Sequence, residues 1–460
     1  MDWLRSSKRF LVLLVVSLAW HGCVKAKQEF SPALQQAGVE LLQAGKIEEA
    51  ITRLKEAAEK DPKSVDARYF LGVAFSQNGL WDEALEAYGK AIQLQSNHAE
   101  AHVGRGVAFG GKGRLDDAIT AYKEALKLKP DYPEAHEFLG DVYVRKGLLD
   151  EAIAAFQKAI EKRPNYPEAY HALGLAYSGK GQITDAILAF RKAVSLAPTY
   201  PEAFNNLGQA YRKQGLLDDA VSAFTTAVDQ EPRYAVAYRN LGLTYSDAGL
   251  FAQAISAYLN ALTHSPTYPE AYADLGVAYS RVGRFEEAVH VYKKALAQAP
   301  NSVEAIIGLG NAYRARGLFD EAVKTYTQGL EITQNRDPEV WNKLGITHSA
   351  QKRYDNAIVA FQKAVELSPK SFEYHLNIGV VYSSKEMFPE ANQAFETVLQ
   401  ISPNYAEAQG RIALNMERME KKAGAVAAWK KYVQMIERIP ERADEIRQVR
   451  EKIAALQKQP

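Results

Sequence analysis

Cysteine is nearly absent from this chain, since Cys23 is the single one among 460 residues. A disulfide within the chain is therefore impossible, and stability in an oxidising compartment must come from packing. An excess of one charge is also lacking: 56 basic and 55 acidic residues give a formal net charge of +1, and no block of five or six like charges occurs. Nothing supplies the basic footprint of nucleic-acid binding, so DNA and RNA are not expected partners.

The short motifs of common enzymes are missing as well. Neither G-x-S-x-G nor H-E-x-x-H occurs. The stretch GVAFGGKG at 106–113 follows a phosphate-binding loop only as far as Lys112, because Gly113 stands where Ser or Thr would hold magnesium. The same letters return as GLAYSGKG at 174–181, which indicates a repeated structural element rather than a nucleotide site.

Two histidines remain as a candidate metal pair. His98 and His102 are four residues apart and could share a metal on one helix face, but they stand where neighbouring repeats carry aromatic residues. We therefore expect packed histidines, no metal, no cofactor, no catalytic residue and no enzyme activity.

Long apolar runs are absent too. The apolar run at residues 10–20 (FLVLLVVSLAW) is 11 residues long, which suits a signal peptide but is short for a membrane span. Arg5, Lys8 and Arg9 precede it as a basic segment. Residues 1–26 are thus predicted to be a signal peptide or lipoprotein signal, followed by a short linker at 27–30, and the protein is predicted to be exported.

Two processing routes fit this segment. Cleavage after Ala26 would use a small-residue site, whereas Cys23 follows Gly22 as in a bacterial lipobox, in which the cysteine is lipidated. Trp20 and His21 depart from that pattern, and an uncleaved anchor is a third alternative. The expected location is the bacterial periplasm or, as a lipoprotein, the outer membrane, with membrane contact only through a possible lipid anchor at Cys23.

A period of 34 residues runs through the rest of the chain. Each marker glycine is followed by an aromatic residue three and sixteen positions later and by alanine twelve positions later. The marker glycines are Gly72, Gly106, Gly140, Gly174, Gly208, Gly242, Gly276 and Gly310. One residue is inserted near 333–337, and the pattern defines twelve repeats that start at 31, 65, 99, 133, 167, 201, 235, 269, 303, 338, 372 and 406.

Each repeat predicts two amphipathic helices. In 167–200, apolar residues recur at spacings of three and four in two stretches. Pro167 can begin the first helix, Gly181 permits the turn, and Gly174 is small where the helices press together. Extra glycines in the third repeat, Gly104 among them, are expected to loosen its first helix.

This pattern of aromatic, Leu-Gly, Tyr, Ala, Phe, Ala and Pro resembles the tetratricopeptide repeat over residues 31–439. The resemblance implies an all-α, right-handed superhelical solenoid whose first helices line a concave groove. Residues 440–460 are predicted to form a capping helix, in which Ile446, Val449, Ile453 and Leu456 cover the last repeat.

Function is expected in that groove, at positions 2, 5, 6, 9, 12 and 13 of each repeat. An apolar part comprises Tyr69, Phe70 and Phe138, with Val73, Val103 and Val107. The polar part comprises Asn205, Asn206, Gln209, Arg212, Lys213, Arg239, Asn240, Asp274, Asn311, Arg314, Asn342 and Lys343. Amides can pair with any peptide group and the cations can select carboxylates, so the expected partner is a protein or an extended peptide.

Other interpretations stay open. Asn206 and Asn240 are similar to the asparagine ladder of O-linked N-acetylglucosamine transferases, but Asp274 and Gly308 break it. A binder of glycan or polysaccharide in export, or a repeat subunit that regulates an enzyme in trans, are the alternatives to a scaffold that organises a cell-envelope complex. The groove side chains could also serve only to solvate an inner face.

Overall fold

The computed structural model describes residues 30–458, and that range contains α-helices and one short 3-10 helix but no β-strand. The predicted all-α repeat fold is confirmed. The signal segment 1–26 with Cys23, and residues 27–29 of the predicted linker, lie outside the described residues.

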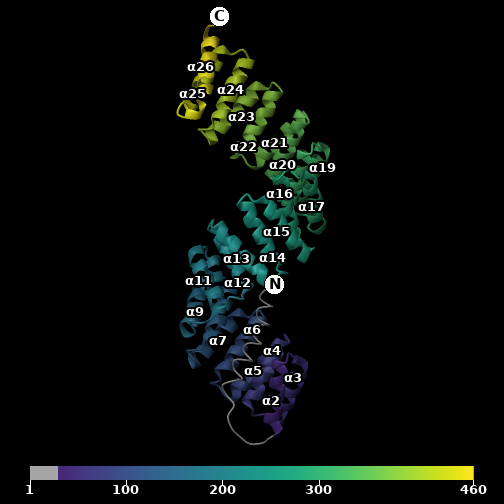
Figure 1. The fold of residues 1–460 in the computed structure, drawn as a ribbon, viewed down its shortest axis with the longest axis vertical. Helices are drawn as coiled ribbons and strands as arrows, with labels where there is room; N and C mark the ends of the chain where they lie inside the picture. The colour runs from purple at the N-terminus through teal and green to yellow at the C-terminus, as the bar shows by residue number, and fades with distance from the viewer. Residues whose placement is uncertain (1–29, 459–460) are drawn as a thin grey trace. The chain divides into compact units, whose positions relative to one another are not determined.

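The described helices form successive pairs in two compact units, residues 30–232 and 233–458 (Figure 1). The first helices of the pairs in unit 1 are α2 (Phe30–Gln43), α4 (Val65–Gln77), α6 (Ala99–Gly111), α8 (Pro133–Arg145), α10 (Pro167–Gly179) and α12 (Pro201–Lys213). The second helices in unit 1 are α3 (Ile47–Lys60), α5 (Trp81–Leu94), α7 (Leu115–Leu128), α9 (Leu149–Lys162), α11 (Ile183–Leu196) and α13 (Leu217–Gln230).

Unit 2 repeats the arrangement. Its first helices are α14 (Ala235–Asp247), α16 (Pro269–Arg281), α18 (Val303–Ala315), α20 (Pro338–Ala350), α22 (Phe372–Ser384) and α24 (Ala406–Arg418). Its second helices are α15 (Phe251–His264), α17 (Phe285–Gln298), α19 (Phe319–Ile332), α21 (Tyr354–Leu367), α23 (Phe388–Ile401) and α25 (Lys422–Ile436), followed by η1 (Pro440–Arg442) and α26 (Ala443–Lys458).

An aromatic ring laid over a glycine joins the two helices of a pair. The Tyr88 ring of α5 lies on Gly72 of α4, where an added Cβ would meet a ring carbon at 2.6 Å. The same ring lies against Gly104 of the next first helix, where an added Cβ would meet it at 2.4 Å. Gly104 is therefore a packing residue as well, because it makes room for Tyr88.

The turn between the helices of a pair needs a left-handed residue. Nine repeats place glycine there, from Gly45 to Gly317, with φ between 73° and 80°. The last three repeats hold the same conformation with Lys352, Glu386 and Glu420, at φ of 58°, 65° and 58°. A side chain in this region costs about 1 kcal/mol, so these three turns store strain that the glycine turns avoid.

The inserted residue lengthens one turn, and the end of the chain packs on the last helix pair. Gln334 and Asn335 take positive φ values of 51° and 60° in the longer turn before α20. At the chain end, α26 packs on α25 through Ile446, Val449 and Ile453, each 8% exposed, as predicted for a cap. Among the described helices, none is both long enough and apolar enough to span a membrane.

Candidate functional site: the first-helix faces

Within each unit the first helices lie on the inner side of the stack. Successive first helices contact one another, as α4 does α6 and α16 does α18, whereas no comparable contact joins successive second helices among the described residues. Closer approach on one side curves a stack toward that side. The positions predicted to line a groove therefore lie on first helices at the inner side of each unit.

Part of the predicted apolar groove is used for packing. The Tyr69 ring is buried against Phe70, Tyr88 and His98, with ring centroids 5.1, 6.0 and 5.1 Å apart. Val73 and Val103 are also buried. Phe70 and Phe138 are half-buried, and Phe138 stacks on Tyr122 at 5.9 Å. The apolar surface left on these helices is thus smaller than the sequence suggested.

A tyrosine at the end of each of two repeats reaches back to position 5 of the same repeat. The Tyr166 hydroxyl donates a hydrogen bond to Glu137 Oε2. Tyr200 Oη lies 3.1 Å from His171 Nδ1 by the same 29-residue step. These contacts fix the position-5 side chains before any ligand arrives.

Two carboxyl groups on α8 were missed from the sequence. Glu137 and Asp141 occupy positions 5 and 9, and Glu137 is 3% exposed. Burial raises the pKa of Glu137 well above its usual range, and the nearby Asp141 carboxylate raises it further, while the Tyr166 hydrogen bond acts in the opposite direction. Burial likewise raises the pKa of Asp141 to about 7, against the opposing Arg145 guanidinium. Both residues could have been found, because these positions were predicted to face the groove.

A row of hydrogen-bonded side chains crosses α10 and α12 in unit 1. Asn206 Nδ2 lies 2.8 Å from His171 Nε2, and Gln209 Nε2 donates to Asn206 Oδ1 at 3.2 Å. Burial lowers the pKa of His171 to about 4, so the ring is neutral near pH 7. With Asn206 as donor, the neutral ring donates its Nδ1 proton to Tyr200 Oη. His171 is a third residue that the sequence interpretation missed, and the second at position 5.

The remaining predicted residues of unit 1 differ in exposure. Asn205 is 3% exposed, so its amide is not presented to a ligand, unlike the prediction for its position. Lys213 is exposed and Arg212 half-buried in the last turn of α12, where a cation interacts favourably with the helix C-terminus.

In unit 2 several predicted groove residues pair with neighbouring side chains. Arg239 Nε donates to Asp274 Oδ2 at 2.6 Å, and its guanidinium lies 5.6 Å from the centroid of the Tyr268 ring. Asn311 Oδ1 accepts from the Tyr326 hydroxyl at 2.9 Å. Arg239 therefore has a structural role, because it pairs with Asp274. The substitution Arg239→Glu would place a second carboxylate beside Asp274.

Farther along unit 2, Asn342 is 1% exposed and buried in a hydrogen-bonded chain. Its Oδ1 accepts from Asn377 at 2.8 Å and its Nδ2 donates to Glu373 at 3.4 Å. Lys343, by contrast, is half-buried beside Glu339 at 3.7 Å. Asn240 and Arg314 are half-buried on α14 and α18. Lys343 thus suits ligand contact better than Asn342 does.

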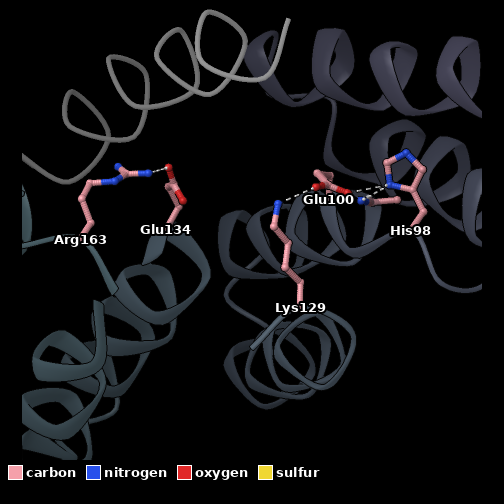
Figure 2. A network of polar contacts seen from close by, with 6 residues as sticks. His98, Glu100, Lys129, Glu134 and Arg163 are labelled. Carbon is pink, nitrogen blue, oxygen red and sulfur yellow. Dashed lines mark hydrogen bonds and ion pairs between the residues drawn. The ribbon is translucent and has the colours of Figure 1, made fainter. Parts of the chain in front are cut away.

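Two glutamates at position 2, Glu100 and Glu134, form ion pairs with cations of the same repeat (Figure 2). Lys129 Nζ lies 3.2 Å from Glu100, and Arg163 pairs with Glu134, each 29 residues along. His98 Nδ1 lies 3.5 Å from Glu100, on the opposite side from Lys129. These contacts tie the end of a second helix to the start of the first helix of its own repeat.

The glycine-rich stretch at 106–113 is the hairpin of a helix pair. Gly106 faces the Tyr122 ring, Gly113 is the turn residue, and Lys112 pairs with Asp82 of the preceding repeat. The two histidines are also engaged in backbone contacts: His98 Nδ1 accepts from Ala101 N at 3.1 Å, and His102 Nε2 lies 3.1 Å from the Ser96 carbonyl. Over residues 30–458, no cluster of three or more His, Cys, Asp or Glu suits a metal ion.

The helix pairs and their first-helix faces define an all-α repeat protein of the protein-interaction class. Models of the tetratricopeptide repeat match residues 36–99, 76–119, 103–167, 155–187, 179–215, 201–234, 233–301, 281–345 and 338–371, which together cover 36–371. The chain belongs to the tetratricopeptide repeat family. Members of this family are generally non-enzymatic scaffolds that bind proteins or peptides.

Several solved structures are similar to the chain. MamA is 32% identical, with 35% of this chain and 94% of MamA covered and a TM-score of 0.34. YrrB, described as a TPR protein with an unusual peptide-binding site, is 27% identical over 41% of this chain and 96% of its own, with a TM-score of 0.37. Yeast Tom70 is 16% identical over 93% and 96%, with a TM-score of 0.42. No match was found among curated proteins.

Proposed function

We propose that the chain binds an extended peptide segment of a partner protein on the first-helix face of unit 1 and so organises a protein complex. The observation that carries this proposal is the row of His171, Asn206 and Gln209, joined by hydrogen bonds of 2.8 and 3.2 Å. A row held in place before binding loses little side-chain entropy when a ligand arrives. Amides offer both a donor and an acceptor, which suits the peptide groups of an extended chain.

Site-specific photo-crosslinking tests the face that binds. A photoreactive side chain at Lys213, exposed at the end of α12, is expected to crosslink one defined protein in the native bacterial envelope. The same side chain at Thr225, exposed on α13, is the matched control and should not crosslink it. Adding Asn206→Ala and Gln209→Ala should reduce the crosslink at Lys213 at least tenfold, because the row that holds the peptide is lost.

Two outcomes would contradict the proposal. An equal yield from Thr225, or a yield at Lys213 that ignores the two alanines, would move the interface away from the first-helix face. Saturable binding of an envelope glycan that the same two alanines abolish would favour the carbohydrate alternative.

We also propose that the protein is exported to the cell envelope and lipidated at Cys23. The basic residues before the apolar run at 10–20 support a signal peptide, and Cys23 after Gly22 supports lipidation. Metabolic labelling with a palmitate analogue is expected to label the wild-type chain and not Cys23→Ser. A wild-type chain that stays unlabelled and begins at Lys27 would show cleavage after Ala26 instead.

A further inference from the structure

A groove on the second-helix side of unit 2 is separate from the first-helix face. It lies between α15 and α17 and has a volume of about 730 Å³. Tyr272, Leu275 and Tyr279 of α16 form its floor. Both walls contact α16, whereas α15 and α17 have no comparable contact with each other among the described residues. The space between the walls is thus bounded by side chains on three helices and open to solvent.

One wall carries a leucine where the other repeats have polar residues or glycine. Leu259 is 45% exposed and stands at position 25 of its repeat. The other repeats have Lys55, Gly89, Lys123, Gln157, Arg191, Thr225, Lys293, Thr327, Gln362, Glu396 and Lys430 at this position. A single exposed leucine is ordinary, but this one borders a groove whose floor is apolar. Leu259 therefore extends the apolar surface from the floor up the α15 wall.

The opposite wall and rim carry cations. Lys293, Lys294 and Arg316 line the groove, and no carboxylate of residues 30–458 lies within ion-pair distance of them. Lys294 Nζ lies 5.7 Å from the Tyr272 ring centroid and Lys293 Nζ lies 5.7 Å from that of Tyr313. These cations contact aromatic rings, which leaves their charge available to an anionic partner.

The acidic residues of the groove lie near the start of α17. Glu287 Oε1 accepts from Arg284 at 2.8 Å, so its charge is already compensated, and Glu286 lies beside it. The far part of the α17 wall, at His290, Lys293 and Lys294, has no acidic residue among the groove-lining side chains. Charge complementarity in that part of the groove therefore points to a partner with carboxylates.

We propose that this second-helix groove docks an acidic amphipathic helix of a partner protein. Its apolar side chains contact Leu259 and Tyr272, and its carboxylates reach Lys293 and Lys294. An amphipathic helix presents apolar side chains at i, i+3, i+4 and i+7, with charges flanking them, which matches an apolar floor with one basic wall. The site shares no residue with the first-helix face, so the chain can hold two partners at once.

Fluorescence anisotropy with defined probes tests this. One labelled peptide is a 14-residue designed helix with leucines on one face and glutamates beside them, and its matched probe has lysines in place of the glutamates. The full chain is expected to bind the acidic probe saturably and the basic probe at least tenfold more weakly. Leu259→Lys places at position 25 the residue type of the next repeat and should weaken binding of the acidic probe at least tenfold.

Three controls separate the alternatives. Leu188→Lys makes the same change at a 59% exposed leucine on α11 in unit 1 and should leave binding unchanged. Lys293→Glu with Lys294→Glu should weaken the acidic probe and strengthen the basic one. Asn206→Ala with Gln209→Ala should have no effect, so failure here is distinguishable from failure of the first-helix proposal. No saturable binding of the acidic probe, or equal binding by Leu259→Lys, would overturn the inference.

Discussion

Gly72→Ala is expected to destabilise the protein, whereas Gly89→Ala is expected to stabilise it. At Gly72 an added Cβ would lie 2.6 Å from a ring carbon of Tyr88, and that ring is confined on its other side by Gly104. Overpacking of this kind costs about 1–3 kcal/mol and exceeds the roughly 1 kcal/mol that alanine gains over glycine in a helix. At Gly89 an added Cβ would meet nothing within 4 Å, so only the helical gain of about 0.5–1 kcal/mol remains.

Urea unfolding of the full chain checks this pair, with amide hydrogen exchange in α4 and α5 as a local readout. Exchange is needed because neighbouring repeats can open separately, so one global midpoint does not report each pair. We expect faster exchange in α4 and α5 for Gly72→Ala and slower exchange for Gly89→Ala. A neutral Gly72→Ala would mean that the Tyr88 ring moves aside, and the close packing described above would be wrong.

Unit 1 is expected to lose stability as the pH rises from about 4 to about 7, because Glu137 and Asp141 hold protons in the folded state. Burial raises the pKa of both, that of Asp141 to about 7, whereas the unfolded chain releases these protons near pH 4. Between those values the folded state binds more protons than the unfolded state, so stability falls with rising pH and levels off above the folded pKa. For Asp141 alone, the pKa difference between the unfolded chain and the folded state corresponds to a loss on the order of 4 kcal/mol.

Other charged groups face this pair and set the size of the effect. Glu134 and Glu168 raise the pKa of Glu137 further, whereas Arg145 lowers that of Asp141. His171 acts in the opposite direction in the same unit. Its folded pKa of about 4 lies below its unfolded value, so its stabilising contribution is lost as the pH falls from about 6.5 to about 4. The stability difference between a Glu137 and Asp141 double variant and wild type reports on the carboxyl pair alone, because His171 contributes equally to both.

Glu137→Gln with Asp141→Asn keeps shape and removes both titrations, so it should be about as stable as wild type at pH 4.5 and clearly more stable at pH 8. Tyr166 can still donate its hydrogen bond to the new amide oxygen. Asp150→Asn removes an 81% exposed carboxylate of the same unit and is the matched control. Hydrogen exchange of α8 at the two pH values gives the measurement. A double variant that exchanges as wild type does at pH 8 would show that the carboxylates are solvated in the folded state and that their pKa values are not raised.

Much of the fold was predictable because the 34-residue period shows which residues are equivalent in successive repeats. The marker glycines predict where the two helices of a pair press together, and the structure places the Tyr88 ring on Gly72 at that point. Prolines at 133, 167, 201, 269 and 338 predict helix starts, and helices begin there. The period also predicted that position 5 faces the groove, whereas the structure buries Glu137 and Asn205 there, each 3% exposed.

The candidate site was less predictable, because the environment of each groove side chain is made by residues 29 to 35 positions away in the sequence. The sequence predicts a groove-facing side chain at both Asn205 and Asn206, yet Asn205 is buried while Asn206 bonds to His171 on the preceding first helix. Arg239 was predicted to contact ligand, but Asp274 lies 35 residues away and pairs with it.

The amino-acid order alone thus settles the helix pairs, their turns and the side of each helix that faces inward, because these depend on contacts within a repeat or between identical positions. Only the tertiary structure determines which polar side chains are paired, buried or exposed to a partner, because this depends on packing between helices of different repeats. The same holds for the groove at Leu259: the sequence shows a leucine at a polar position, and only packing places Tyr272 below it and Lys294 across from it.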